Sequence, residues 1–186
     1  MKRILSIVLC LVLALGLAAI AETATEEKIN IGSLEVNGEF ILKASIADGY
    51  TIIPFDSDPW MSIWFISSED VNKPVMSLVI AYDEAYADIF RINDMTEEQL
   101  KNLEATWNEY EVEISYPETA YGTKLLQAVE VGDYTDFVTF FAIYEGYCIE
   151  FNLIANPEGE VQNLTQEQID MAIKFLSDLD FVPIEN

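Results

Sequence analysis

Two stretches of the chain are apolar at almost every residue. Trp60–Ser67 reads WMSIWFIS, and Val75–Tyr82 reads VMSLVIAY. Successive side chains of a β-strand point to opposite faces, so these runs predict strands that are apolar on both faces. Strands of that kind lie in the interior of a sheet whose two faces are both covered. The pattern therefore predicts a central sheet packed between other layers.

A third stretch, Phe137–Asn156, predicts a long β-hairpin. Its sequence is FVTFFAIYEGYCIEFNLIAN, and Glu145-Gly146 is the predicted two-residue turn. This turn places Ile143 opposite Cys148. One face of the hairpin is then almost purely apolar, and it comprises Val138, Phe140, Ala142, Tyr144, Tyr147, Ile149, Phe151 and Leu153. Cys148 lies on the other, mixed face.

Two amphipathic helices are predicted, and each has the same signal at its start. The first lies within Met95–Tyr110 and the second within Leu164–Leu179. A threonine followed three residues later by a glutamine predicts a capping box in both helices; the pairs are Thr96 with Gln99 and Thr165 with Gln168. The predicted core-facing stripes are Leu100, Leu103, Trp107 and Tyr110 in the first helix and Ile169, Ala172, Ile173 and Leu176 in the second.

Shorter runs complete the predicted sheet. Asn37-Gly38 and Asp48-Gly49 mark turns between β-rich runs, and Val112–Tyr116 and Lys124–Val131 are typical of strands between the two helices. No linker rich in proline, glycine or serine divides the chain. We therefore predict one α+β domain over residues 31–186, with a largely antiparallel β-sheet flanked by helices and the last helix closing the fold.

The order of these elements resembles the PsbP-like αβα sandwich. The residues that carry the resemblance are ASIADGYTIIPF (Ala44–Phe55), then a hairpin, an amphipathic helix and long strands, and the ending IDMAIKFLSDLDFVP (Ile169–Pro183). The family includes an extrinsic photosystem subunit, a Ran-binding nuclear import factor and many exported bacterial proteins. The resemblance, over about Gly38–Pro183, implies an accessory or binding role rather than a catalytic one. It carries over no site residue, because no functional motif matches.

The start of the chain has the form of a bacterial signal peptide. Lys2 and Arg3 precede an apolar run, and Ala19-Ile20-Ala21 puts small residues at the positions that signal peptidase reads. The alternatives are an uncleaved membrane anchor and lipidation at Cys10.

We therefore predict a signal peptide over residues 1–21, followed by a disordered acidic segment over residues 22–30. The remaining protein is expected to be secreted or located in the cell envelope, with no stable membrane insertion after cleavage of the signal.

Composition excludes several kinds of function. Without the leader, 7 basic residues face 33 acidic ones, a net charge of −26. Such a surface repels nucleic acids, whose binding depends on basic side chains that displace counterions, so we expect no nucleic-acid partner. The chain also has no histidine. That absence removes serine and cysteine catalysis built on histidine, and zinc sites built on imidazole.

The one cysteine outside the leader, Cys148, is predicted to be a packing residue. A nucleophilic cysteine needs a nearby cation or a helix N-terminus that stabilises its thiolate. No lysine or arginine occurs from Leu125 to Ile173, and Glu150 on the same face of the hairpin favours the neutral thiol. A single cysteine also forms no internal disulfide, so we expect the packed core alone to stabilise the domain.

The acidic loop AYDEAYADIFRINDM, which follows the second apolar run, is the predicted contact surface. Loops between rigid elements carry function more often than core residues do. The candidate residues for binding a partner protein or a small ligand are Tyr82, Asp83, Glu84, Tyr86, Asp88 and Phe90. We predict a non-enzymatic binding or accessory domain without a cofactor, and we expect Tyr86 and Phe90 to be exposed together.

Two other functions are compatible with so many acidic residues. Asp83, Glu84 and Asp88 offer oxygen ligands for calcium, which requires the three side chains to converge. A hydrolase acting on a glycan or another envelope polymer requires two carboxylates across a cleft, one of them desolvated. Aromatic residues such as Trp60 and Trp64 would then line a groove for the polymer.

Overall fold

The computed structural model describes the greater part of the chain after its N-terminal region. The described residues are 34–36, 39–43, 49–58, 61–107, 110–130, 136–156, 163–177 and 180–184. The predicted signal peptide and the predicted acidic segment lie outside these residues. No helix in the described ranges has the length and apolar character needed to cross a bilayer.

The centre of the fold is a seven-stranded sheet in which all neighbouring strands are antiparallel. In spatial order its strands are β3 (Thr51–Asp58), β4 (Met61–Ser67), β5 (Val75–Tyr82), β9 (Tyr147–Ile154), β8 (Phe137–Tyr144), β7 (Leu126–Glu130) and β6 (Val112–Ser115). The two runs predicted to be apolar on both faces are β4 and β5, which are interior strands. The predicted α+β class with a largely antiparallel sheet is confirmed.

The two faces of this sheet carry separate hydrophobic clusters, because alternate residues of each strand point to opposite faces. On β8, Phe140 and Tyr144 belong to the first cluster, whereas Phe141 and Ile143 belong to the second. The side chains at the centre of the first cluster are almost completely buried, and they include Leu78, Ile80, Val138 and Leu153. Burial of these apolar side chains is the main stabilising term of the fold.

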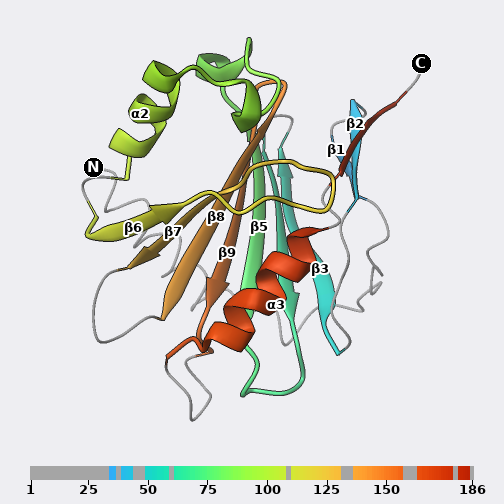
Figure 1. The fold of residues 1–186 in the computed structure, drawn as a ribbon. Coiled ribbons are helices and arrows are strands. Elements are labelled where there is room, and N and C mark those ends of the chain that lie inside the picture. The colour runs from blue at the N-terminus through green and yellow to red at the C-terminus, as the bar shows by residue number, and fades with distance from the viewer. Residues whose placement is uncertain are drawn as a thin grey trace.

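Helices pack on both clusters. Helix α3 (Gln166–Ser177) contributes Ile169, Ala172 and Leu176 to the first cluster. The second cluster is covered by α2 (Glu97–Ala105) and by the short 3-10 helices η1 (Glu84–Tyr86) and η2 (Ile92–Asp94). Figure 1 shows α3 lying across one face of the sheet, with α2 set towards one end. The sheet is therefore covered by helices on opposite faces, as its apolar strands require.

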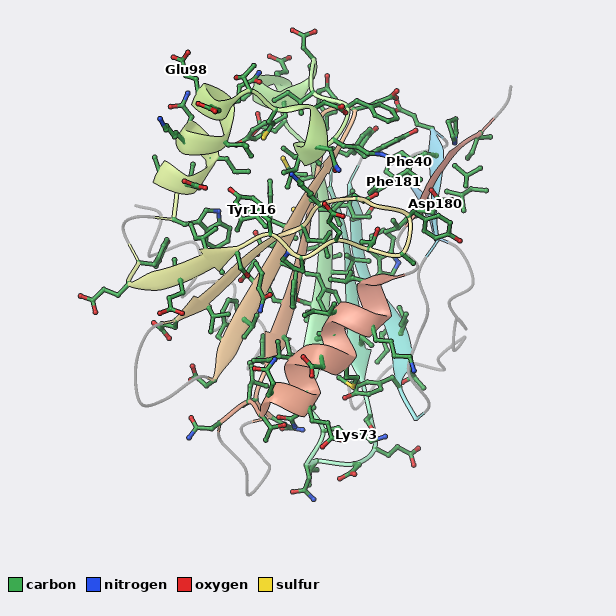
Figure 2. The ribbon with its side chains drawn as sticks, in the orientation of Figure 1. Phe40, Lys73, Glu98, Tyr116, Asp180 and Phe181 are labelled. Carbon is green, nitrogen blue, oxygen red and sulfur yellow. The ribbon has the colours of Figure 1, made fainter. Side chains whose placement is uncertain are left out.

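A second, smaller sheet packs against the first hydrophobic cluster. It consists of β1 (Leu34–Val36), β2 (Phe40–Lys43) and β10 (Asp180–Pro183), with β2 in the middle. The expectation that the last helix closes the fold is therefore wrong. The chain continues into β10, because Phe181 has an apolar site available: its ring stacks on Tyr144 with centroids 4.4 Å apart. Phe40 on β2 contacts both of these rings, and Figure 2 shows it next to Phe181.

The two capping boxes form as predicted, but α2 is shorter than its apolar stripe implied. Thr96 and Gln99 exchange hydrogen bonds between side chain and backbone, as do Thr165 and Gln168 at the start of α3. Helix α2 ends at Ala105, so Trp107 and Tyr110 lie beyond it. The following Thr106 donates a hydrogen bond from its hydroxyl to the carbonyl of Leu103, which competes with continuation of the helix. Both aromatic residues still reach each other, with ring centroids 6.5 Å apart.

The turn between β8 and β9 has the predicted register. Ile143 is opposite Cys148, and Tyr144 is opposite Tyr147. Both turn residues have positive φ, 44° at Glu145 and 84° at Gly146, which is the type I′ geometry that matches the twist of the flanking strands. Glu145 is the one residue other than glycine with positive φ in the described ranges.

Gly146→Ala is expected to lower the free energy of unfolding by about 2–4 kcal/mol, through left-handed strain and steric overlap. A Cβ atom at this position would lie 2.7 Å from Cε2 of Tyr82 and 3.2 Å from the Cα atom of Ala87. Gly122→Ala is the matched control: φ there is 72°, but a Cβ atom would meet no atom within 4 Å. We expect the control to cost only about 1–2 kcal/mol. Urea unfolding measures both, and equal losses would contradict the steric argument.

Candidate functional site: an acidic pocket beside the central hairpin

A pocket of about 810 Å³ lies where the small sheet meets one end of the large sheet. Its lining residues are Glu39, Tyr82, Asp83, Glu84, Glu145 and Tyr147. They come from four places in the chain: the residue before β2, the segment where β5 leads into η1, the β8–β9 turn, and the first residue of β9. The site therefore depends on both sheets.

Two tyrosine rings form the most buried part of the pocket. Tyr147 is only 5% exposed, and its ring lies edge-on to Tyr82 with centroids 5.4 Å apart. The Tyr147 hydroxyl donates a hydrogen bond of 2.6 Å to Oε2 of Glu39. Because Glu39 precedes β2, this bond joins the small sheet to the large one and orients the Glu39 carboxylate in the pocket wall.

The backbone of the pocket is fixed by the end of β5. The amide of Asp83 donates to the carbonyl of Gly146 at 2.8 Å, which connects this end of β5 to the β8–β9 turn. The Asp83 side chain accepts a hydrogen bond from the amide of Ala85 and so caps η1. The Asp83 carboxylate consequently has a defined direction at the rim.

Four acidic residues line the pocket together with the two rings, and all four are exposed: Glu39, Asp83, Glu84 and Glu145. No basic residue is among those that line the pocket. Carboxylates attract positive charge, and the negative faces of tyrosine rings do the same when they are accessible. The chemistry of this pocket therefore suits a positively charged group with some apolar surface.

Only three of the six residues predicted for the contact surface line the pocket. Tyr82, Asp83 and Glu84 line the pocket. Asp88 is exposed but outside the lining.

Tyr86 and Phe90, expected to share one exposed surface, contact opposite faces of the sheet. Tyr86 is half-buried and contacts Phe141 in the second cluster, with ring centroids 6.4 Å apart. Phe90 contacts Tyr144 in the first cluster at 5.3 Å. Only Phe90 of the two is a largely exposed aromatic residue, at 44%.

The two alternative functions find little support in this geometry. Within the described residues, no three acidic or cysteine side chains are grouped closely enough to hold a metal ion, so Asp83, Glu84 and Asp88 do not converge as calcium ligands. The carboxylates in the pocket are all exposed, whereas hydrolysis by an acid pair needs one desolvated acid. Trp64 is buried in the first cluster, and Trp60 lies outside the described residues.

Sequence reasoning missed half of the pocket: Glu39, Glu145 and Tyr147. The hairpin register correctly put Tyr147 on the apolar face, but its hydroxyl partner Glu39 is 108 residues away in the chain. A local signal existed for Glu145. Type I′ turns favour asparagine, aspartate or glycine at both positions, so a glutamate there is unusual enough to merit attention.

Cys148 has the environment of a packing residue. It is partly buried beside the second cluster. Burial, followed by the negative charges of Asp83 and Glu150, raises the pKa of its thiol to about 12. At neutral pH the thiol is therefore protonated and a poor nucleophile. This agrees with the role predicted from the absence of basic residues nearby.

Comparison with known proteins adds no identification. No protein-family model matches the chain, and neither the curated proteins nor the solved structures give a significant match.

The Cys148 thiol is expected to react about 100-fold or more slowly with iodoacetamide at about pH 8 in the folded protein than in urea, because its raised pKa suppresses the thiolate. A Cys10→Ser background leaves Cys148 as the single thiol. Mass spectrometry measures the labelling rate. Rapid labelling of the folded protein would show that the thiol is activated, contrary to the packing role.

Proposed function

We propose that this chain is an exported, non-enzymatic binding domain whose acidic pocket takes a positively charged group. The observation that carries the proposal is the combination of four exposed carboxylates with two tyrosine rings in one pocket that has no basic lining residue. The ligand is either a small organic cation or a cationic side chain of a partner protein. Without three grouped acidic ligands in the described residues, a bare divalent metal is a poorer fit.

The backbone at Glu145 supports this assignment. A non-glycine residue in the left-handed region costs about 1–2 kcal/mol, and glutamate lacks the short polar side chain that makes asparagine and aspartate tolerable there. Strained residues of this kind cluster at binding sites, where the surrounding structure compensates for them. Glu145 lines the pocket, so a role for its carboxylate accounts for a residue that the turn itself does not favour.

The proposed location and class rest on the sequence. The leader favours export, and the PsbP-like resemblance implies an accessory or binding role. The strong negative charge of the chain points to cationic rather than nucleic-acid ligands.

We expect lysine amide, arginine amide and tetramethylammonium to bind in the pocket, and the uncharged acetyl-glutamine amide not to bind. Glu39→Gln keeps an acceptor for the Tyr147 hydroxyl but removes one charge from the wall. It should weaken cation binding about two- to fivefold, the effect of an exposed ion pair. Raising salt from about 0.05 to about 0.5 M should weaken binding further through screening. NMR chemical-shift titration measures both effects.

Glu113→Gln is the matched control for this experiment. Glu113 is an exposed acid on the edge strand β6 and is absent from the pocket lining, so the control removes the same net charge elsewhere. It should leave cation affinity within about 1.5-fold, because exposed charges beyond a Debye length are screened. Equal weakening by both substitutions would mean that cations bind the acidic surface in general, and the pocket would lose its assignment.

Glu145→Asn is expected to separate stability from binding. Asparagine followed by glycine is the preferred type I′ pair, so the free energy of unfolding should rise by about 0.5–1 kcal/mol. The same substitution removes a carboxylate from the pocket and should weaken cation binding. Urea unfolding and the NMR titration together test this. A variant that gained stability and kept full affinity would show that Glu145 has no part in binding.

A further inference from the structure

A second feature lies next to the pocket: an exposed aromatic ring with an arginine over it. Phe90 is 44% exposed, although its ring contacts the buried Tyr144. The guanidinium carbon of Arg91 lies 5.1 Å from the centroid of the Phe90 ring. We call these two residues the Phe90–Arg91 platform. Stacking on an aromatic ring fixes the orientation of the guanidinium plane of an arginine. The N–H groups at the edge of that plane remain available for a carboxylate.

Arg91 has no acidic partner in the described part of the chain, although acids outnumber bases there. Its Nε atom is buried and donates no hydrogen bond to any described residue. Buried polar nitrogen atoms in native proteins almost always have a partner, and each exception calls for an explanation. Arg91 as a whole is only half-buried, so a carboxylate of a bound partner would pair with the terminal nitrogen atoms of the guanidinium rather than with the buried Nε atom.

The platform and the pocket are directly connected. The amide of Glu145, a pocket residue, donates a hydrogen bond of 3.2 Å to the carbonyl of Phe90. The preceding residue, Tyr144, holds the Phe90 ring. The platform therefore adjoins the β8–β9 turn, which lines the pocket.

We infer that the pocket and the Phe90–Arg91 platform form one interaction surface for a polypeptide segment of mixed charge. A lysine or arginine of the partner enters the pocket, an apolar side chain covers Phe90, and a carboxylate pairs with Arg91. The first of these contacts rests on the proposed function; the other two do not.

Charge complementarity selects this occupant. A small cation has no anionic group to pair with Arg91, and a purely basic segment would be repelled by Arg91. Aromatic residues and arginine are also the residue types enriched in protein interfaces.

The test uses short peptides blocked at both ends, in which lysine, leucine and aspartate occur at several spacings. Each peptide is compared with a control peptide of the same sequence that has asparagine in place of aspartate. Affinities are measured by NMR titration of the protein and of its Arg91→Gln variant. We expect Arg91→Gln to weaken the best aspartate peptide about five- to tenfold and the asparagine peptide less than twofold, which is the signature of a direct charge pair.

Further variants separate the possible failures. Arg91→Lys keeps the charge but loses the planar stack. Its affinity for the aspartate peptide should therefore lie between the affinities of the native protein and of Arg91→Gln. Phe90→Ser should weaken leucine peptides but not their glycine counterparts. Thermal melts establish that each variant is folded.

The outcomes for this inference and for the proposed function are distinct. If Arg91→Gln weakens the binding of both peptides equally, Arg91 does not pair with the carboxylate. The inferred partner of mixed charge is then wrong, whereas the proposed cation pocket is unaffected. If the peptides and the small cations all fail to bind, both proposals are wrong.

Discussion

The register of the β8–β9 hairpin is the constraint on which the rest of the structure depends. The two-residue turn at Glu145 and Gly146 fixes which residue of β8 faces which residue of β9. Since side chains alternate between faces, a slip of one residue would move every apolar side chain of a strand to the opposite cluster. Strand β9 pairs with β5 and β8 pairs with β7, so the same register also sets which faces of these neighbouring strands must be apolar.

The turn also builds the pocket, because it positions three of the walls at once. Gly146 accepts the hydrogen bond that holds Asp83, Glu145 projects from the turn itself, and Tyr147 begins β9. The absence of a side chain at Gly146 leaves the room that the Tyr82 ring occupies. The same turn thus contributes both to the fold and to the pocket. A change that relaxes the turn is expected to act on stability and on the proposed ligand site together, and the strand pairing on either side compensates the strain at Glu145.

Local sequence patterns predicted most helices, strands and turns correctly. They failed for features that depend on contacts between residues far apart in the chain. The capping boxes at Thr96 and Thr165 and the turn at Gly146 involve residues at most four positions apart, so the sequence itself contains the cause. Strand β10 has no such local signal: it forms because Phe181 fits between Phe40 and Tyr144, which come from two other elements. Tyr86 is the last residue of η1, and a turn at residues 87–88 follows it. Tyr86 and Phe90 consequently contact opposite faces of the sheet, although they are only four residues apart.

The exposed position of the pocket carboxylates limits the kind of binding that the site supports. Exposed ion pairs contribute little individually because water and salt screen them, so four such carboxylates favour fast, salt-sensitive association rather than tight retention. Tight binding requires buried apolar anchors with desolvated polar partners. Next to the pocket, the exposed ring of Phe90 contacts Tyr144 and has Arg91 over it, and a bound partner would desolvate both Phe90 and Arg91. On the proposed function, the pocket would steer a partner and the platform would hold it, which requires a partner long enough to reach both.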